Sequence, residues 1–418
     1  MAAPALLRSR AIERSPIYYG WVVLAAGTFG MAMTMPGRTH AIAVVIDPIM
    51  ADAGVSRGIA SALFMAGTLG ASFLMTPFGR WLDAQGPRRA VAVVCVLFGL
   101  SCFQMALVSG PATLLLAILT LRGFGQGALN VVSQHVINQW FVRRRGFAMG
   151  VAGVGVAIAN TVFPIAVSWA IVAHGWRAAY YAMGLLTLCL MLPVGAAFYR
   201  QRPELYGLVP DGLELPGEAA RPLAEEHWTR EDAIRTTTFW VFALGDFMTA
   251  GLGTGLLFHH YSLMAANGLD RLAATALFLP LGLVTALFNI LAGIALDRYQ
   301  PRHVLAVALA CLVVALGLGG LAHSPQGVLA YGVVLGMTIG IASSVTGVAL
   351  PHHFGRLHLG SIKGVSQTCF IAGTAIGPVP FALAFQFGGS YWPAIFGSMA
   401  LAIALLVLAL VHRPARRI

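Results

Sequence analysis

Long apolar runs alternate with short polar breaks along the whole chain. A helix that crosses a bilayer needs about 20 mainly apolar residues, and breaks at charged and Gly/Pro clusters divide this chain into twelve such runs. The runs are 17–46, 57–79, 89–109, 112–140, 146–172, 177–199, 237–266, 271–296, 303–322, 326–354, 361–387 and 391–412. The pattern predicts an all-α membrane protein with twelve transmembrane helices.

One connection between these runs is long and polar. It covers residues 200–236 and is rich in proline, glycine and acidic residues, a composition typical of a linker. We therefore expect an N-terminal six-helix half at 1–199, a cytoplasmic linker at 200–236 and a C-terminal six-helix half at 237–418.

The composition excludes a water-soluble globule. The 418 residues are 58% hydrophobic and only 10% charged, whereas soluble domains carry about a quarter charged residues. This much apolar surface needs lipid to cover it. The five cysteines are scattered through apolar runs without the spacing of metal ligands, so neither a metal nor a cofactor is predicted.

The positive charge is distributed as membrane orientation requires. Of the 26 lysine and arginine residues, only Arg57, Arg177 and Arg271 fall in the outer loops when the N-terminus is placed inside. The positive-inside rule then puts both termini in the cytoplasm. Although the net charge is +11, no basic stripe lies on a soluble element, so a nucleic-acid partner is not expected.

The two halves contain a direct repeat. GRWLDAQGPRR begins at Gly79, and GIALDRYQPRH begins 214 positions later at Gly293. The same offset pairs Asp83 with Asp297. A repeat of this kind indicates two parallel six-helix units with a substrate site at their interface.

These motifs resemble those of a known family. GRWLDAQGPRR is similar to the loop between the second and third helices of the major facilitator superfamily, and LRGFGQG at 121–127 resembles the Arg-Gly motif of its fourth helix. YYGWVVLAAG at 18–27, NQWFVRRRGFAMG, HHFGRLHLGSIKG and RPELYGLVPDG resemble the bacterial monocarboxylate porter and oxalate/formate antiporter branch. The resemblance covers the whole chain and implies a carrier of the bacterial inner membrane, expected to be a monomer.

Ionisable groups inside spans are functional candidates because they are costly in lipid. Arg38 and His40 follow a Pro-Gly break in the first run, and the resemblance implies that Arg38 takes the place of a substrate-binding lysine. In the fourth run Arg122 begins a polar series with spacing four, in which Gln126 and Asn130 come next. An arginine can hold a carboxylate through two parallel hydrogen bonds. Alternatively, Arg38 extends to the outer headgroups and Arg122 caps carbonyls or pairs with a neighbouring helix.

The sequence also departs from the resemblance. Relatives carry an eighth-helix arginine four residues before the loop glycine, where this chain has Asn289, and the eleventh run has Gln367 rather than a mid-span lysine. Because a dicarboxylate needs a second fixed cation, these changes weaken an oxalate assignment. Asn289 and Gln367 are retained as residues that orient the substrate.

Three residues of the seventh run are candidates for proton coupling. Asp246 is a carboxyl group inside a span, and a buried carboxyl can exchange a proton during a transport cycle. His259 and His260 near the outer end titrate close to neutral pH, although they point about 100° apart and cannot both line one cavity. The other interpretations are a hydrated inner-gate residue for Asp246 and packed or interfacial histidines.

The inner loops contain the gating candidates. The resemblance assigns Asp83, Arg88 and Arg89, together with Asp297 and Arg302, to ion pairs that keep the cytoplasmic side closed in the outward-open state. The alternative is a solvated basic cluster.

The predicted function is secondary transport of a small organic anion of the monocarboxylate class, coupled to a proton or a counter-solute. No Walker A sequence occurs, so the energy must come from a gradient. Two alternatives stay open: a proton-coupled exporter of neutral or amphipathic drugs, and a transporter-like sensor that signals through the 200–235 loop. No nucleophile–base pair occurs at motif spacing, so an enzyme is not expected.

Overall fold

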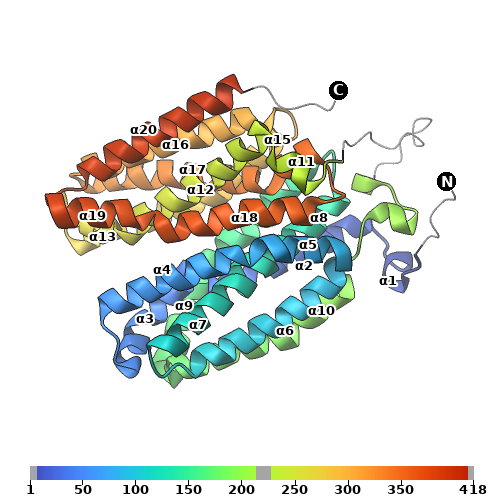
Figure 1. The fold of residues 1–418 in the computed structure, drawn as a ribbon, viewed down its shortest axis with the longest axis horizontal. Coiled ribbons are helices and arrows are strands. Elements are labelled where there is room, and N and C mark those ends of the chain that lie inside the picture. Colours follow the sequence, from blue (N-terminus) through green and yellow to red (C-terminus); the bar gives the residue numbers. More distant parts are fainter. Residues whose placement is uncertain (1–6, 213–226, 413–418) are drawn as a thin grey trace.

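The computed structural model describes residues 7–212 and 227–412, and in these residues every regular element is helical. Two helical bundles lie side by side, one from the blue-to-green first half of the chain and one from the yellow-to-red second half (Figure 1). The short helix α1 (Arg10–Glu13) and the end of the last helix lie at the same end of the molecule. We call this end the linker side and the opposite end the far side.

The first bundle follows the predicted runs closely. Its elements are α2 (Tyr19–Ala32), η1 (Met35–Gly37), α3 (Thr39–Ala53), α4 (Arg57–Phe73), α5 (Met75–Gln85), α6 (Pro87–Ala106), α7 (Pro111–Leu121), η2 (Arg122–Leu129), α8 (Asn130–Trp140), α9 (Arg145–Leu186), η3 (Thr187–Met191) and α10 (Leu192–Phe198). Here η1 is a 3-10 turn, and η2 and η3 are π-helical stretches within longer helices.

The second bundle has the same organisation. After the linker elements η4 (Pro203–Tyr206), η5 (Pro210–Gly212) and α11 (Arg230–Ile234) come α12 (Thr237–Phe258), α13 (His260–Ala266), α14 (Arg271–Thr275), α15 (Phe278–Leu296), α16 (Pro301–Leu321), α17 (Pro325–Phe354), α18 (Leu359–Ile376), α19 (Pro378–Gly388) and α20 (Trp392–Val411). Several helices begin with a residue that favours a helix N-terminus. Prolines occupy the first turns of α6, α16 and α17, where the missing N–H is not needed.

Ten helices within the described residues are long and apolar enough to cross a membrane. One of them, Arg145–Phe198, has 54 residues and contains the non-helical Gly175, so it is long enough for the two runs predicted at 146–172 and 177–199. The first predicted run is absent from the ten because it is broken into α2, η1 and α3. Twelve crossings therefore stay a prediction, while the all-helical membrane fold is confirmed.

The break in the first run brings two segments of the first bundle together. Pro36 and Gly37 form the 3-10 turn η1, and a Cβ on Gly37 would lie 2.4 Å from the Leu121 carbonyl oxygen. Only glycine permits this close approach. The turn therefore lies directly against the start of η2, where Arg122 begins.

The outer surface of the bundle is apolar where lipid would cover it. Trp169 is 78% exposed, Val172 89%, Leu272 82% and Phe387 81%. Isolated exposed apolar side chains are ordinary in soluble proteins, but a surface that gathers so many of them is suited to hydrocarbon.

The described part of the linker packs on both bundles. The Asp211 carboxylate accepts hydrogen bonds from the backbone amides of Val142, Arg143 and Arg144 at 2.8–3.3 Å. Glu204 pairs with Arg356 of the second bundle at 2.6 Å. The linker thus fixes the loop before α9 and joins the two bundles at the linker side.

Candidate substrate site and gate

Arg122 is the most deeply buried cation at the interface between the bundles. Its side chain is 0% exposed. Nη1 donates to the Thr39 hydroxyl at 3.1 Å and to the Gly37 carbonyl at 3.4 Å, and Nη2 donates across the interface to the Thr374 hydroxyl at 2.9 Å. The guanidinium carbon lies 5.1 Å from the centre of the Phe64 ring. Nε has no partner, and no described carboxylate pairs with this charge.

Arg38 lies between the 3-10 turn η1 and the helix α3. Its Nε donates to the Thr34 hydroxyl at 2.9 Å, and its positive charge acts on Arg122. The broken first helix therefore places two guanidinium groups near each other, as a site for an anion requires. The side chain of His40 lies outside the described residues.

The polar series of the fourth helix is buried along its length. Gln126 and Asn130 are each 7% exposed, and Gln134 donates to the Asn130 side chain at 3.4 Å. The side-chain oxygens of Gln126 and Gln134 have no partner. Such unpaired acceptors are unusual in a buried site, and they lie on the helix that carries Arg122.

The two predicted orienting residues belong to different contacts. Gln367 donates from Nε2 to the Gln126 backbone carbonyl at 3.4 Å and so lies beside the polar series. Asn289 donates to the Thr285 carbonyl at 2.9 Å and accepts from the Ser343 hydroxyl. A Cβ on Gly153 would lie 2.3 Å from the Asn289 amide oxygen. Asn289 therefore occupies the contact between α15 and α9, whereas Gln367 is beside Gln126.

Asp246 belongs to a buried cluster that sequence analysis did not identify. Its two carboxylate oxygens accept hydrogen bonds from Thr346 at 2.5 Å and Ser366 at 2.6 Å. Lys363 is 1% exposed, donates to the Thr346 carbonyl at 3.3 Å, and its charge acts on Asp246. Lys363 lies near the start of the run predicted at 361–387, where a cation gives no sign of burial. A candidate proton site therefore has a buried cation beside it.

The two histidines are hydrogen-bonded to backbone carbonyls of their own bundle. His259 is hydrogen-bonded to the Pro378 carbonyl at 3.1 Å, and its ring stacks on Phe381. His260 is fully buried and hydrogen-bonded to the Ala274 carbonyl at 2.8 Å. Thirteen residues separate His259 from Asp246, about 20 Å along a helix. The histidines and Asp246 are thus not brought together, and no group of metal ligands occurs among the described residues.

The repeated aspartates bind helix starts of the opposite bundle. Asp83 accepts hydrogen bonds from the backbone amides of Gly360 and Ser361 at 2.7 and 2.6 Å. Asp297 accepts from the amides of Gly146 and Phe147 at 2.6 and 2.9 Å. Burial raises the pKa of Asp297, and these two amides oppose that shift. Negative charge at a helix N-terminus is favourable because the amides and the helix dipole point toward it.

The bundles also approach closely at the repeated glycines. A Cβ on Gly79 would lie 2.1 Å from the Gly360 carbonyl oxygen, and one on Gly293 would lie 2.4 Å from the Gly146 carbonyl oxygen. Gly146 and Gly360 are themselves 214 positions apart, like Gly79 and Gly293. The same contact is therefore built twice, and it closes the linker side.

The predicted gating arginines have other partners. Arg88 donates to the Ala196 carbonyl at 2.8 Å, Arg89 to the Gln85 side chain at 3.2 Å, and Arg302 to the His412 carbonyl. Asp83 and Asp297 accept hydrogen bonds from backbone amides of the opposite bundle, and the gating role of these residues stays a prediction. The amide positions could not be read from the sequence because they depend on how the two bundles pack.

Comparisons with known proteins agree with this geometry. The sequence model described as Major Facilitator Superfamily matches residues 21–284 and 247–418. The chain is similar to a galacturonate transporter of Dickeya chrysanthemi, with 25% identity over 54% of this chain and 67% of the relative. It is also similar to a probable sulfoacetate transporter, SauU, of Cupriavidus necator, with 23% identity over 76% of each chain.

Two further similarities come from human proteins. Monocarboxylate transporter 11 of Homo sapiens is 29% identical over 60% of this chain and 50% of its own length. Among solved structures, the human organic anion transporter MFSD10 (TETRAN) superposes with a TM-score of 0.65 and 18% identity, covering 94% of this chain and 100% of that chain. This structural match supports the same fold.

Proposed function

This chain belongs to the major facilitator superfamily, and we propose that it is a secondary transporter that carries a small organic anion, specifically a monocarboxylate, across the bacterial inner membrane by alternating access. The observation that carries the proposal is Arg122. A fully buried guanidinium without a carboxylate partner is costly to maintain, and a carboxylate ligand would supply the missing charge.

The surroundings of Arg122 suit one carboxylate group. Its two Nη atoms now donate to neutral partners, the Thr39 and Thr374 hydroxyls and the Gly37 carbonyl. A carboxylate would replace neutral acceptors with charged ones, and charge-assisted hydrogen bonds are about twice as strong. Arg38 adds a second positive charge nearby, while Gln126 and Gln367 offer polar atoms for the rest of the substrate.

The relatives point to the same class of cargo. The names of three of them refer to galacturonate, sulfoacetate and monocarboxylates, all organic anions. Asn289, in the contact between α15 and α9, is neutral and adds no fixed cation to Arg122 and Arg38. A substrate with a single carboxylate fits these residues best.

Alternating access would use the repeated contacts at the linker side. Arg122 and Thr374 form one hydrogen bond between the bundles. Asp83 and Asp297 form others, because each caps the start of a helix in the opposite bundle. Opening the linker side would separate the two caps from their amides. Because Arg122 itself bonds across the interface, a carboxylate that takes over its donors would also change a link between the bundles.

Proton coupling would use Asp246 and Lys363. When Asp246 carries its charge, Lys363 and the hydroxyls of Thr346 and Ser366 stabilise it. When Asp246 is protonated, Lys363 becomes an uncompensated buried cation and would favour an approaching anion. This arrangement would couple proton uptake to anion binding through the electrostatics of the second bundle.

The test is transport by purified protein in proteoliposomes. A panel of mono- and dicarboxylates is first screened by thermal shift at two pH values, since a ligand that binds the folded state raises its apparent stability. Uptake of the strongest ligand is then measured with wild type, Arg38→Gln and Arg143→Gln, the last removing an exposed arginine away from Arg122. We expect loss of uptake only in Arg38→Gln.

The same measurements separate the other two functions. A drug exporter would bind neutral or amphipathic compounds, and its transport would survive Arg38→Gln. A sensor would bind the anion without any flux. Either result overturns the proposal of anion transport, although the fold and the family stand.

A further inference from the structure

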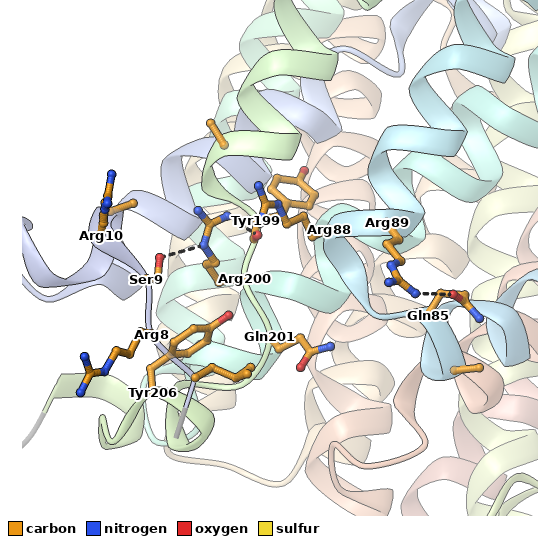
Figure 2. A pocket seen from close by; sticks show the side chains of 14 residues that line it. Arg8, Ser9, Arg10, Gln85, Arg88, Arg89, Tyr199, Arg200, Gln201 and Tyr206 are labelled. Carbon is orange, nitrogen blue, oxygen red and sulfur yellow. Dashed lines mark hydrogen bonds between the residues drawn. The ribbon is translucent and has the colours of Figure 1, made fainter. Parts of the chain in front are cut away.

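A basic cavity of about 900 Å³ lies at the linker side of the first bundle, apart from Arg122 (Figure 2). It is formed by α1 and the residues before it, the junction of α5 and α6, the end of α10 and η4. Its lining consists of Leu7, Arg8, Ser9, Arg10, Ala11, Ala84, Gln85, Arg88, Arg89, Ala197, Tyr199, Arg200, Gln201 and Tyr206.

Among the described residues, the lining holds five arginines and no acidic residue. Arg200 is 8% exposed and is fixed by bonds to the Ser9 hydroxyl at 3.2 Å and the Tyr199 carbonyl at 2.9 Å. Arg8 and Arg10 are exposed and have no carboxylate partner among the described residues. Figure 2 shows these residues among the side chains that line the cavity. Five like charges in one cavity repel each other, and an anion would relieve that repulsion.

An exposed apolar stripe begins at the edge of this cavity. On α6, Val93, Val96 and Leu100 follow Arg89 at spacings of four, seven and eleven residues, so the four residues share one helix face. These three apolar side chains are 40–53% exposed. The stripe extends about 16 Å from Arg89 toward the far side, and Phe198 at the end of α10 is also exposed.

The geometry points to a binding site for an anionic phospholipid, with the phosphate in the arginine-lined cavity and an acyl chain along the exposed face of α6. A basic pocket at the end of transmembrane helices is suited to an anionic headgroup, and the arginine guanidinium matches phosphate oxygens in geometry. The adjoining apolar stripe distinguishes a lipid from a soluble phosphate, which would use only the cavity.

The experiment measures lipid binding to purified, delipidated full-length protein. The probes are dioleoyl phosphatidylglycerol, dioleoyl phosphatidylcholine and glycerol 1-phosphate, and the readouts are native mass spectrometry and thermal shift. The test variant is Arg8→Gln with Arg10→Gln. The matched control is Arg14→Gln with Arg143→Gln, which removes the same charge from exposed positions outside the lining.

We expect phosphatidylglycerol to bind wild type and the control pair equally, and phosphatidylcholine to bind neither. Loss of two cavity arginines should weaken phosphatidylglycerol binding about 30-fold, and Arg8→Lys with Arg10→Lys should restore most of it. Equal weakening in both glutamine pairs would mean diffuse surface charge and overturn the site. Glycerol 1-phosphate binding as tightly as phosphatidylglycerol would overturn the lipid assignment.

Discussion

Arg122→Leu separates a substrate-binding role for this arginine from a structural one. If Arg122 binds the carboxylate through two charge-assisted hydrogen bonds, each contributes about 1.5 kcal/mol or more. Their loss corresponds to about 3 kcal/mol, or about 100-fold in affinity. Arg122→Lys keeps the charge but not the planar pair of donors, and it should fall between leucine and wild type.

The substitution Arg122→Leu should weaken substrate binding without lowering the stability of the unliganded protein. In the unliganded protein Arg122 is a buried charge with an unpaired Nε and with no carboxylate partner among the described residues. Replacing it by leucine removes the cost of desolvating that charge, and replacement of buried charges by apolar residues is often neutral or stabilising. The Thr374 hydroxyl, one of its acceptors, keeps its own bond to the Ile371 carbonyl at 2.7 Å. We therefore expect no fall in the unfolding temperature.

Both quantities come from thermal unfolding of the purified protein over a range of carboxylate concentrations. The midpoint without ligand reports stability, and its rise with concentration gives the affinity. If the role of Arg122 were mainly structural, Arg122→Leu would lower the midpoint temperature of unfolding measured without ligand. A dissociation constant within threefold of the wild-type value in Arg122→Leu would refute the substrate-binding role.

Three further predictions concern the rest of the molecule. Asp246→Asn should abolish accumulation driven by a pH gradient in proteoliposomes yet preserve exchange of labelled for unlabelled substrate; unchanged accumulation would remove Asp246 from coupling. Gly79→Ala should widen spin-label distances between the bundles at the linker side, because its Cβ would lie 2.1 Å from a carbonyl oxygen, whereas Gly397→Ala, with nothing within 4 Å, should not. Hydrogen bonds from Trp176 and Arg177 lower the pKa of Asp52, so their stabilisation is present above the usual aspartate pKa and lost as pH falls through the lowered one; the gap in melting temperature between wild type and Asp52→Asn should stay constant near neutral pH and shrink as the pH falls below about 4.

The helices were largely predictable because lipid imposes a simple pattern. Apolar runs of sufficient length have little alternative to crossing the bilayer as helices. The predicted run 326–354 differs from α17 by one residue at its start. The first run was harder, because Pro36 and Gly37 occur in an apolar stretch and their effect depends on packing against Leu121. The Pro-Gly pair predicts a break at this position, but the close approach of Gly37 to Leu121 depends on tertiary packing.

The candidate site was only partly predictable for a related reason. Arg122 was identified because a charge inside a span is unusual by itself. Lys363 could not be identified because it lies near the start of its run, and its burial beside Asp246 depends on how α12, α17 and α18 pack. The aspartates of the repeat were also identified, but their acceptor role toward backbone amides was not, since backbone amides carry no sequence signal.

The repeated caps make a modest contribution to holding the linker side closed, beside the glycine contacts and the pair between Glu204 and Arg356. Each aspartate satisfies two amides at the start of a helix in the other bundle, and removing such a cap typically costs about 1 kcal/mol. Two caps then contribute only about 2 kcal/mol to closure. A ligand can shift a conformational equilibrium by no more than its difference in affinity for the two states, and a difference of this size is within reach of one charged hydrogen bond to Arg122. Binding of one small anion can therefore offset the contribution of the two caps, while the glycine contacts and the Glu204–Arg356 pair at the same side add to the total.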